Sequence, residues 1–364
     1  NLKPSEVNFM PRVLIAAGGT GGHIYPGIAV AKELMSRDET SEVLFVGTAK
    51  GLETRIVPEN GFQLSVIKST GLKNVGLKGK IRGMWTLPKS FLEAWKLIRD
   101  YRPNVVIGAG GYVSGPVLLT AALMGRRTLV MDSNALPGFT NRKLAKFVDK
   151  AALTFEEAVP FFGKKAVVTG NPVRGEFFDI EFEEPRSPLR LLVFGGSQGS
   201  QAINRAVTAA TEFLDKAAVS IVHQTGESDQ ENVSSEYETA GWEVEVRPYI
   251  TNIVDSFRET DLIICRAGAT TCAEVAAAGK PAIMIPLPTA ADDHQRKNAE
   301  ALVRAGAAEM ILQSELTGKT LADKIDEFIA DRTRLVEMSR SARKLARPDA
   351  AAATVDIIEE LAKK

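Results

Sequence analysis

One pattern occurs twice in the chain, first as Arg12-Val-Leu-Ile-Ala-Ala-Gly-Gly-Thr-Gly-Gly22 and again as Leu189-Arg-Leu-Leu-Val-Phe-Gly-Gly-Ser-Gln-Gly199. Each copy is a continuous apolar run that ends in a glycine-rich turn. A continuous rather than alternating apolar run is typical of a strand buried on both faces of a parallel sheet. The repeat therefore predicts two similar domains, each opening with a strand, a turn and a helix.

Similar apolar runs recur in both halves, separated by amphipathic stretches such as 28–36, 203–214 and 296–305. This alternation predicts the α/β class: two Rossmann-like, doubly wound parallel-sheet domains with an interdomain cleft. Ligands of such sheets bind at the carboxyl ends of the strands. The predicted strands are Arg12–Ala17, Val43–Gly47, Leu64–Lys68, Val105–Ala109, Thr128–Met131, Ala166–Thr169, Leu191–Phe194, Val219–Gln224, Glu243–Tyr249, Leu262–Cys265, Ala282–Ile285 and Glu309–Leu312.

We expect an amino-terminal domain over residues 10–172 and a carboxyl-terminal domain over 173–347. The stretches Asn171–Gly175 and Glu181–Pro188 are rich in proline and charge, which predicts a linker. The last helix, within 348–364, can pack back on either domain, and we place it with the first. Residues 1–9 are polar and aperiodic, so we expect a tail before a natural start at Met10.

Composition excludes several classes of protein. The chain has 364 residues, 45% of them hydrophobic, which fits two domains of roughly 150 residues rather than a disordered chain. Lysine plus arginine and aspartate plus glutamate both number 45, so no global basic field favours nucleic acid. No apolar run reaches membrane-spanning length, and no leader argues for secretion. Cys265, Cys272 and three histidines suit a reducing cytoplasm and form no metal-ligand cluster.

Three glycine-rich loops follow predicted strands, at Gly18–His23, Gly108–Pro116 and Gly195–Gly199. Glycines let the backbone approach a ligand closely, and the amides at the start of the next helix favour an anion. The loops therefore predict a phosphate-bearing ligand, although a ligand-free βα turn remains an alternative for each. They match neither the Walker sequence nor the G-x-G-x-x-G dinucleotide sequence. His23, beside the first loop, is either a packing residue or a general base.

The order of six motifs resembles the MurG family of glycosyltransferases, and the resemblance runs from Met10 to about Leu361. The motifs are the three glycine loops, Asn171-Pro-Val-Arg174, Cys265-Arg-Ala-Gly-Ala-Thr-Thr-Cys-Ala-Glu274 and Asp292-Asp-His-Gln-Arg-Lys-Asn-Ala299. The resemblance implies the GT-B fold. It also implies inverting transfer of N-acetylglucosamine from UDP-N-acetylglucosamine to the 4-hydroxyl of the muramic acid in undecaprenyl-linked lipid I, forming lipid II for peptidoglycan.

The resemblance also implies roles for individual residues. His23 is the candidate base, and the second loop, with Gly110, Gly111, Tyr112 and Ser114, lies on the acceptor side. Arg174 suits the leaving diphosphate because its guanidinium is planar and permanently charged, with an interdomain salt bridge as the alternative. Glu274 suits the ribose hydroxyls, with an ordinary first-turn carboxylate as the alternative. The implied donor-binding residues are Thr20, Gly21, Gly22, Asn134, Arg174, Ser197, Ile250, Ala269, Thr270, Thr271, Glu274 and Gln295.

One motif departs from the family. Members usually have His-Glu-Gln-Asn where this chain has Met131-Asp-Ser-Asn134. Asn134 is retained, but Asp132 is one methylene shorter than the family's glutamate. A catalytic role for the Asp132 carboxylate is therefore only a secondary hypothesis.

A lipid-linked acceptor requires docking at a membrane surface, and residues 72–102 are the predicted segment. They carry eight basic and two acidic residues in a chain that is neutral overall. Basic and apolar side chains together suit an anionic interface, although a core-facing helix with a solvated basic face is the alternative. Phe91, Leu92, Trp95 and Ile98 have the spacing of a buried stripe. The predicted membrane residues are Leu72, Leu77, Lys78, Lys80, Ile81, Arg82 and Trp85.

The remaining expectations concern partners and alternatives. We expect peripheral attachment to the anionic cytoplasmic face of the bacterial cell membrane, no resident cofactor and no nucleic acid; divalent-cation dependence and protein partners stay open. One alternative is another GT-B enzyme, either a lipid glycosyltransferase or a UDP-N-acetylglucosamine 2-epimerase. Another is a non-catalytic nucleotide-sugar-binding protein. A dinucleotide oxidoreductase is disfavoured because no acidic residue follows a G-x-G-x-x-G turn at the required distance.

Overall fold

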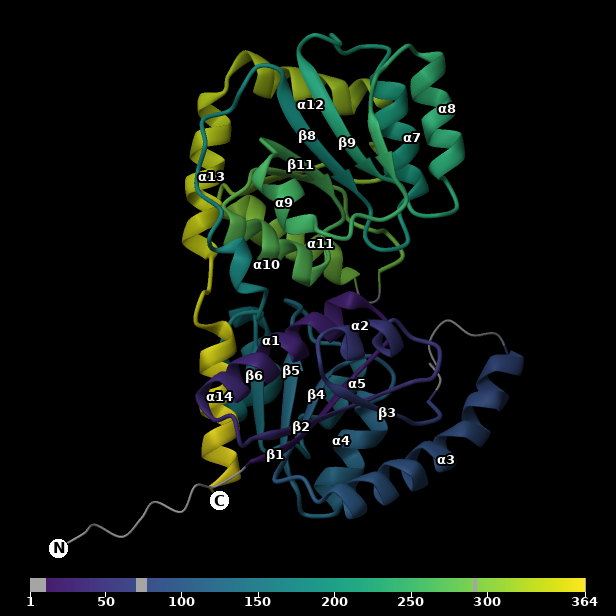
Figure 1. The fold of residues 1–364 in the computed structure, drawn as a ribbon, viewed down its shortest axis with the longest axis vertical. Helices are drawn as coiled ribbons and strands as arrows, with labels where there is room; N and C mark the ends of the chain where they lie inside the picture. Colours follow the sequence, from purple (N-terminus) through teal and green to yellow (C-terminus); the bar gives the residue numbers. More distant parts are fainter. Residues whose placement is uncertain (1–10, 70–76, 291–292, 364) are drawn as a thin grey trace, which may run out of the picture. The chain divides into compact units, whose positions relative to one another are not determined.

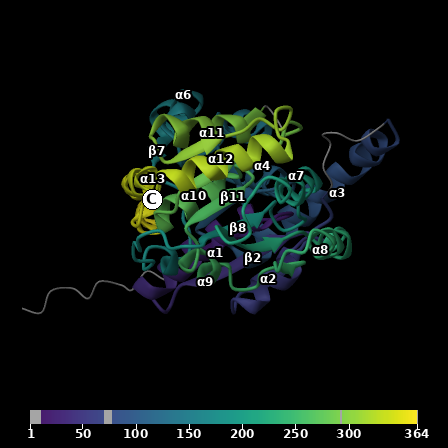
Figure 2. The same cartoon turned by 90° about the horizontal axis from the view of Figure 1, so that it is seen from above.

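The computed structural model describes residues 11–69, 77–290 and 293–363, and for 77–86 it describes the backbone alone. The described chain divides into two compact units. Unit 1 comprises residues up to Ser133, Pro137–Pro172 and Asp349 onward, and unit 2 comprises Asn134–Leu136 and Val173–Pro348. Each unit is built on one parallel sheet with helices on both faces (Figures 1 and 2). The predicted pair of doubly wound α/β domains is confirmed.

The sheet of unit 1 has seven strands in the order β3-β2-β1-β4-β5-β6-β7. Two buried clusters, one on each face, include Val13, Ile15 and Ile107 on one side and Leu14, Val106 and Val130 on the other. The elements are β1 Arg12–Ala17, α1 Gly21–Arg37, β2 Glu42–Gly47, α2 Glu53–Glu59, β3 Gln63–Val66, α3 Leu77–Tyr101, β4 Val105–Gly110, α4 Ser114–Leu123, β5 Arg127–Asp132, α5 Phe139–Leu144, β6 Lys150–Leu153, α6 Val159–Phe162, β7 Ala166–Val168 and α14 Ala350–Ala362, with 3₁₀ turns η1 Glu156–Ala158 and η2 Gly163–Lys165.

The sheet of unit 2 has six strands in the order β10-β9-β8-β11-β12-β13. Two buried clusters again cover the central strands, with Leu191, Val193 and Ile264 in one and Leu192, Ile263 and Cys265 in the other. The elements are η3 Gly175–Phe177, β8 Leu189–Phe194, α7 Gln201–Ala210, β9 Val219–Gln224, α8 Gln230–Thr239, β10 Glu245–Arg247, α9 Ile253–Arg258, β11 Leu262–Cys265, α10 Ala269–Ala278, β12 Ala282–Met284, α11 His294–Arg304, β13 Ala308–Met310, α12 Gly318–Ala330 and α13 Thr333–Leu345.

The terminal helix α14 belongs to unit 1. Val355, Ile358 and Leu361 join the same buried cluster as residues of α1. Arg37 at the end of α1 donates to Asp356 at 2.6 Å. The chain therefore returns to the first unit after completing the second (Figure 1).

Two expectations about the elements need correction. Leu92 and Trp95 were expected in a buried stripe of α3 but are 66% and 44% exposed. Ile98 is buried as predicted, and the buried face continues through Ala94 and Ser90, each one helical turn earlier, because those small side chains fit against the sheet. The predicted linker is also partly packed, since Val173 within it lies in the core of unit 2, as do Phe177 and Ile180 between its two stretches.

Candidate functional site

The first two glycine loops meet at the carboxyl edge of the unit 1 sheet. They follow the adjacent parallel strands β1 and β4, in which Ala16 pairs with Gly108 and Ala17 with Gly110. Gly111, at φ +80°, approaches Gly18 so closely that a Cβ would overlap the Gly18 carbonyl oxygen. The two loops thus form one backbone surface that requires glycine.

His23 lies at this junction of loops. It occupies the first turn of α1, is half-buried, and its backbone N–H donates to the Thr20 carbonyl at 3.1 Å. Its imidazole packs on Gly110, at φ +121°, where a Cβ would overlap the ring. Thr20 is exposed, and Gly21 and Gly22 open the helix beside it. The structure therefore brings together the candidate base and both loops of unit 1.

Two members of the second loop differ sharply in exposure. Ser114 is 1% exposed, and its hydroxyl oxygen accepts the Gly110 N–H at 3.0 Å and lies 2.8 Å from the Ala16 carbonyl oxygen. That hydroxyl secures the loop. Tyr112 is 61% exposed and is available to a ligand from this loop.

Asp132 ends β5 and is 5% exposed. Its Oδ2 accepts the Gly138 N–H at 3.1 Å and the Asn141 Nδ2–H at 2.8 Å, which fixes the start of α5. A small pocket adjoins it at the carboxyl ends of β5, β6 and β7, with Ser133, Thr154 and Thr169 in its wall. One oxygen of the Asp132 carboxylate thus holds the start of α5 in place, and this structural role disfavours Asp132 as the base.

The corresponding edge of unit 2 gathers the carboxyl ends of four strands. Phe194 of β8 pairs with Gln224 of β9 and Cys265 of β11, and Cys265 pairs with Met284 of β12. The third glycine loop, which includes the exposed Ser197, leads into α7 with Ser200 as N-cap. Gly268 caps α10, whose first residues are Ala269, Thr270 and Thr271. Two helix N-termini at one edge suit an anion.

Arg174 and Glu274 are brought together within unit 2. An Arg174 guanidinium nitrogen lies 3.7 Å from Glu274 Oε1, with side chains 28% and 13% exposed. Burial raises the pKa of Glu274 to about 7, and the charge of Arg174 opposes that rise. Glu274 lies in the second turn of α10 rather than the first. A buried carboxyl with a shifted pKa and an arginine partner is typical of a functional site.

Two further donor-site candidates already use part of their hydrogen-bonding capacity. Gln295 Oε1 accepts the Leu287 N–H at 3.0 Å, which ties α11 to the loop after β12. Ile250 is 2% exposed, and its N–H donates to Gln224 Oε1 at 2.8 Å.

Asn134 lies in the segment Asn134–Leu136, which groups with unit 2 rather than with the amino-terminal domain. Ala135 N–H donates to Asn298 Oδ1 at 3.2 Å, and Asn298 Nδ2 donates to the Ala267 carbonyl at 3.2 Å. The retained asparagine is therefore held beside the loop that precedes α10.

Two residues at the unit 2 edge were missed by sequence reasoning. Gln224 is 4% exposed and also donates to the Gly196 carbonyl at 3.0 Å, so it connects the third glycine loop to Ile250. Arg266 donates to Ser200 Oγ and Gln313 Oε1, both at 2.7 Å. The only sequence signal was a polar residue at the end of an apolar strand.

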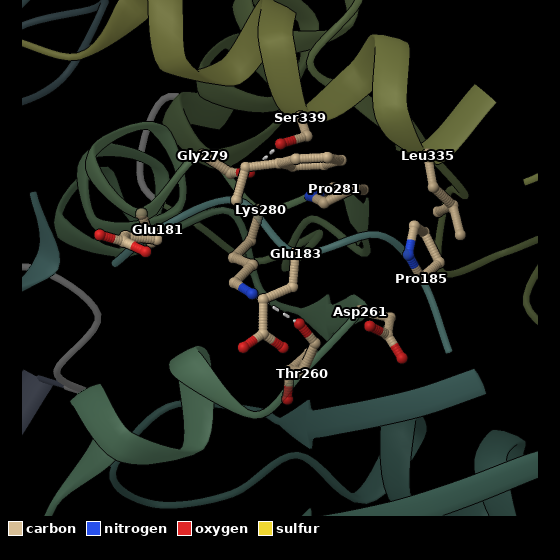
Figure 3. A pocket seen from close by; sticks show the side chains of 12 residues that line it. Glu181, Glu183, Pro185, Thr260, Asp261, Gly279, Lys280, Pro281, Leu335 and Ser339 are labelled. Atoms are coloured by element: carbon tan, nitrogen blue, oxygen red, sulfur yellow. Dashed lines mark hydrogen bonds between the residues drawn. The ribbon is translucent and has the colours of Figure 1, made fainter. Parts of the chain in front are cut away.

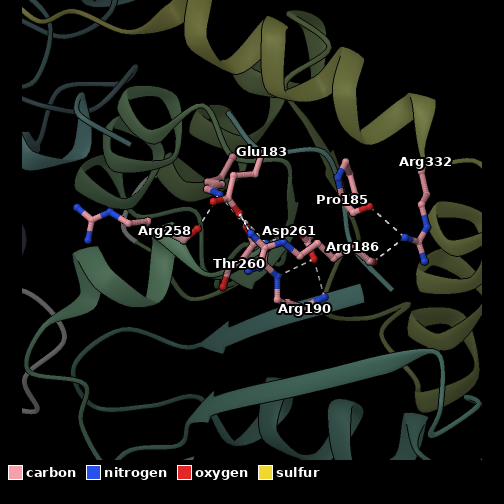
Figure 4. Close-up of polar contacts among 9 residues, drawn as sticks. Glu183, Pro185, Arg186, Arg190, Arg258, Thr260, Asp261 and Arg332 are labelled. Carbon is pink, nitrogen blue, oxygen red and sulfur yellow. Dashed lines mark hydrogen bonds and ion pairs between the residues drawn. The ribbon is translucent and has the colours of Figure 1, made fainter. Parts of the chain in front are cut away.

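Another small pocket belongs to unit 2 (Figure 3). It lies at the amino ends of β11 and β12, whereas the third glycine loop lies at the carboxyl edge of the sheet. Lys280 Nζ donates to the Thr260 carbonyl at 2.7 Å, and burial lowers the pKa of Lys280 to about 8. Nearby, Arg190 forms paired hydrogen bonds to Asp261 at 2.8 and 3.1 Å (Figure 4). Arg190 also donates to Glu183 at 3.4 Å, which ties the segment before β8 to the sheet.

The side chains of the predicted membrane residues lie outside the part of the chain that the structure describes. Leu72 is not among the described residues, and the side chains of Leu77, Lys78, Lys80, Ile81, Arg82 and Trp85 are not described, although the backbone of 77–86 is helical. In the described part of the chain, no helix combines the length and apolar character needed to cross a bilayer.

Comparison with known proteins identifies the family. Residues 13–153 match the glycosyltransferase family 28 N-terminal domain, and residues 190–354 match its C-terminal domain. This chain belongs to glycosyltransferase family 28. The expected MurG resemblance is confirmed at the level of the family.

Relatives within family 28 cover nearly the whole chain. A protein of Syntrophus aciditrophicus (strain SB) is 46% identical over 95% of this chain and 97% of its own length. Its name is UDP-N-acetylglucosamine–N-acetylmuramyl-(pentapeptide) pyrophosphoryl-undecaprenol N-acetylglucosamine transferase. The crystal structure of Acinetobacter baumannii MurG is 33% identical, with a TM-score of 0.78 over 96% of this chain and 99% of that one.

The GT-B architecture extends beyond close relatives. A UDP-GlcNAc 2-epimerase from Neisseria meningitidis, bound to UDP-GlcNAc, has a TM-score of 0.70 at 13% identity, over 96% of this chain and all of that one. That likeness shows a shared fold alone.

Proposed function

We propose that this chain transfers N-acetylglucosamine from UDP-N-acetylglucosamine to the 4-hydroxyl of the N-acetylmuramoyl group of undecaprenyl-linked lipid I, forming lipid II. The observation that carries the proposal is the Arg174–Glu274 pair beside the α10 N-terminus, at the same edge as the third glycine loop. The cation and the helix N-terminus suit a diphosphate, and the buried carboxyl suits the hydroxyls of a ribose.

In the proposed donor complex, unit 2 holds the UDP group. Ser197 and the amides at the starts of α7 and α10 contact the diphosphate, and Arg174 neutralises charge as it leaves. Glu274 accepts hydrogen bonds from the ribose hydroxyls, and the Ile250 backbone contacts the uracil. Gln295 contacts the sugar hydroxyls through its side-chain amide, whose oxygen also accepts the Leu287 N–H.

The proposed reaction is one displacement with inversion at the anomeric carbon. The acceptor 4-hydroxyl oxygen forms a bond to that carbon as the bond to the diphosphate oxygen breaks, and UDP leaves. His23 takes the hydroxyl proton, for which a neutral imidazole is suited. Electrostatic stabilisation of the leaving diphosphate by Arg174 and helix N-termini is expected to be a large part of the catalysis.

The acceptor's lipid implies attachment to a membrane surface. We propose peripheral binding at the cytoplasmic face of the bacterial cell membrane through the basic and apolar residues between Leu72 and Leu87. Each cation near an anionic surface contributes about 1 kcal/mol. No resident cofactor enters the proposed chemistry.

A donor panel tests this proposal. Purified protein is mixed with a lipid I analogue and, separately, UDP-N-acetylglucosamine, UDP-glucose or UDP-N-acetylgalactosamine, with and without chelator, and UDP release is followed. We expect release with the first donor, dependent on the acceptor. Release with another donor alone would replace the substrate assignment, and isomerisation of the sugar without acceptor would indicate a 2-epimerase.

A further inference from the structure

A carboxylate with no assigned role lies behind the first glycine loop. Glu53, the first residue of α2, is 0% exposed. Its Oε2 accepts the Gly19 N–H at 2.9 Å, and its Oε1 accepts both the Thr48 N–H and the Thr48 hydroxyl at 2.8 Å. A buried carboxylate costs free energy unless it is well hydrogen-bonded, and these three donors provide that bonding.

The surrounding backbone is shaped to admit this carboxyl group. A Cβ built on Gly18 would lie 2.8 Å from Glu53 Oε1, and a Cβ on Gly47 or Gly51 would overlap the Glu53 side chain. Gly47 ends β2, and Gly18 follows β1, its neighbour in the sheet. Glu53 therefore bridges the carboxyl ends of two strands in a space formed by three glycines.

A short series of contacts connects Glu53 to His23. Glu53 holds Gly19, and Gly18 touches Gly111 backbone to backbone. Gly110, the residue before Gly111 in that loop, forms the surface on which the His23 ring packs. A shift of the first loop would therefore alter the surface that orients the imidazole.

We infer that Glu53 is a positioning residue that fixes the first glycine loop and, through it, the placement of His23; the inference rests on the proposed function. A carboxylate suits this role because both of its oxygens accept hydrogen bonds. A glutamine amide has one acceptor oxygen, so either Gly19 or Thr48 would face an NH₂ group.

The test compares Glu53→Gln with Asp149→Asn. Asp149 Oδ2 accepts the N–H and hydroxyl of Thr128, both at 2.8 Å, as Glu53 does from Thr48, but at the opposite edge of the same sheet. We expect Glu53→Gln to lower kcat by about tenfold or more, since small misplacements of catalytic groups are costly. Its Kd for UDP should stay close to that of wild type, and Gly19 amide hydrogen exchange should accelerate. Asp149→Asn should lose thermal stability but keep kcat and Gly19 protection.

A second variant tests the inference independently, in case Glu53→Gln does not fold. Gly51→Ala keeps the charge but places a methyl group where Oε2 lies, so it should also lower kcat and expose Gly19. Wild-type kcat and unchanged Gly19 exchange in either folded variant would overturn the inference. If the wild-type enzyme transfers no sugar, the proposed function fails separately, and Gly19 exchange alone decides whether Glu53 fixes the loop.

Discussion

Glu274, which we propose binds the ribose, also carries a cost to folding. Burial raises its pKa from the ordinary 4.5 to about 7. When folding raises the pKa of a carboxyl, the group ionises less readily in the folded state. The free energy of unfolding of the protein therefore falls as the pH rises between the two pKa values. We therefore expect Glu274→Gln to increase the free energy of unfolding at pH 8 by about 1–3 kcal/mol, with little gain at pH 4.5. Urea denaturation without ligand at both values measures this; an equal effect at both contradicts it.

His23 is the residue whose removal should separate catalysis from donor binding. A positioned base contributes about 10²–10⁴-fold to the rate, so His23→Ala should lower turnover within that range. UDP affinity should change little, because the proposed UDP contacts of Arg174 and Glu274 lie in unit 2. Steady-state kinetics and calorimetry measure the two quantities. A loss of only a few fold would assign proton removal to Asp132 or to water.

The end of strand β9 links two parts of the proposed donor site. Gln224→Ala removes the bonds to Gly196 and Ile250, and we expect UDP affinity to fall about tenfold, as for the loss of one buried hydrogen bond. His223→Ala is the control on the same strand, since His223 is also buried but its hydrogen bonds go to Tyr237 and Asn204. Both variants should lower the melting temperature. Equal UDP affinity in the two variants would mean that Gln224 only stabilises the fold.

Among the elements, the buried central strands were the most predictable from sequence. β4 and β11 are continuous apolar runs, because both faces of a parallel strand are covered. Short β6, Lys150–Leu153, was missed because a lysine and alanines carry little strand preference. The buried face of α3 was assigned correctly at Ile98 but wrongly at Leu92 and Trp95, since periodicity gives a stripe of apolar residues but not which of two overlapping stripes meets the sheet.

The predictability of the site follows the same division. The meeting of the glycine loops with the sheet edge could be predicted because strand ends of a parallel sheet share one edge. The roles of Arg174 and Glu274 came from the family resemblance instead. Glu53, Gln224 and Arg266 could not be predicted, because the burial of a polar side chain is set by packing between distant segments. Sequence pattern alone treats such a residue as exposed.

At the scale of the whole molecule, attachment to the bilayer should be separable from chemistry. Replacing Leu77, Ile81 and Trp85 with serine removes the proposed apolar anchors, so binding to anionic vesicles should fall while UDP affinity stays unchanged. Phe213→Ser is the control, because Phe213 is 47% exposed in unit 2. Co-sedimentation at low and high salt measures binding. If the triple variant sediments like the wild type, the 72–87 segment is not the anchor.

The central claim is transfer of one sugar from donor to lipid-linked acceptor with inversion. The most direct measurement is analysis of the product formed from UDP-N-acetylglucosamine and a lipid I analogue, by mass and by the anomeric configuration of the new bond. We predict a lipid-linked disaccharide with a β linkage and one UDP released for each disaccharide. An α linkage, or consumption of the donor without a disaccharide, would contradict it.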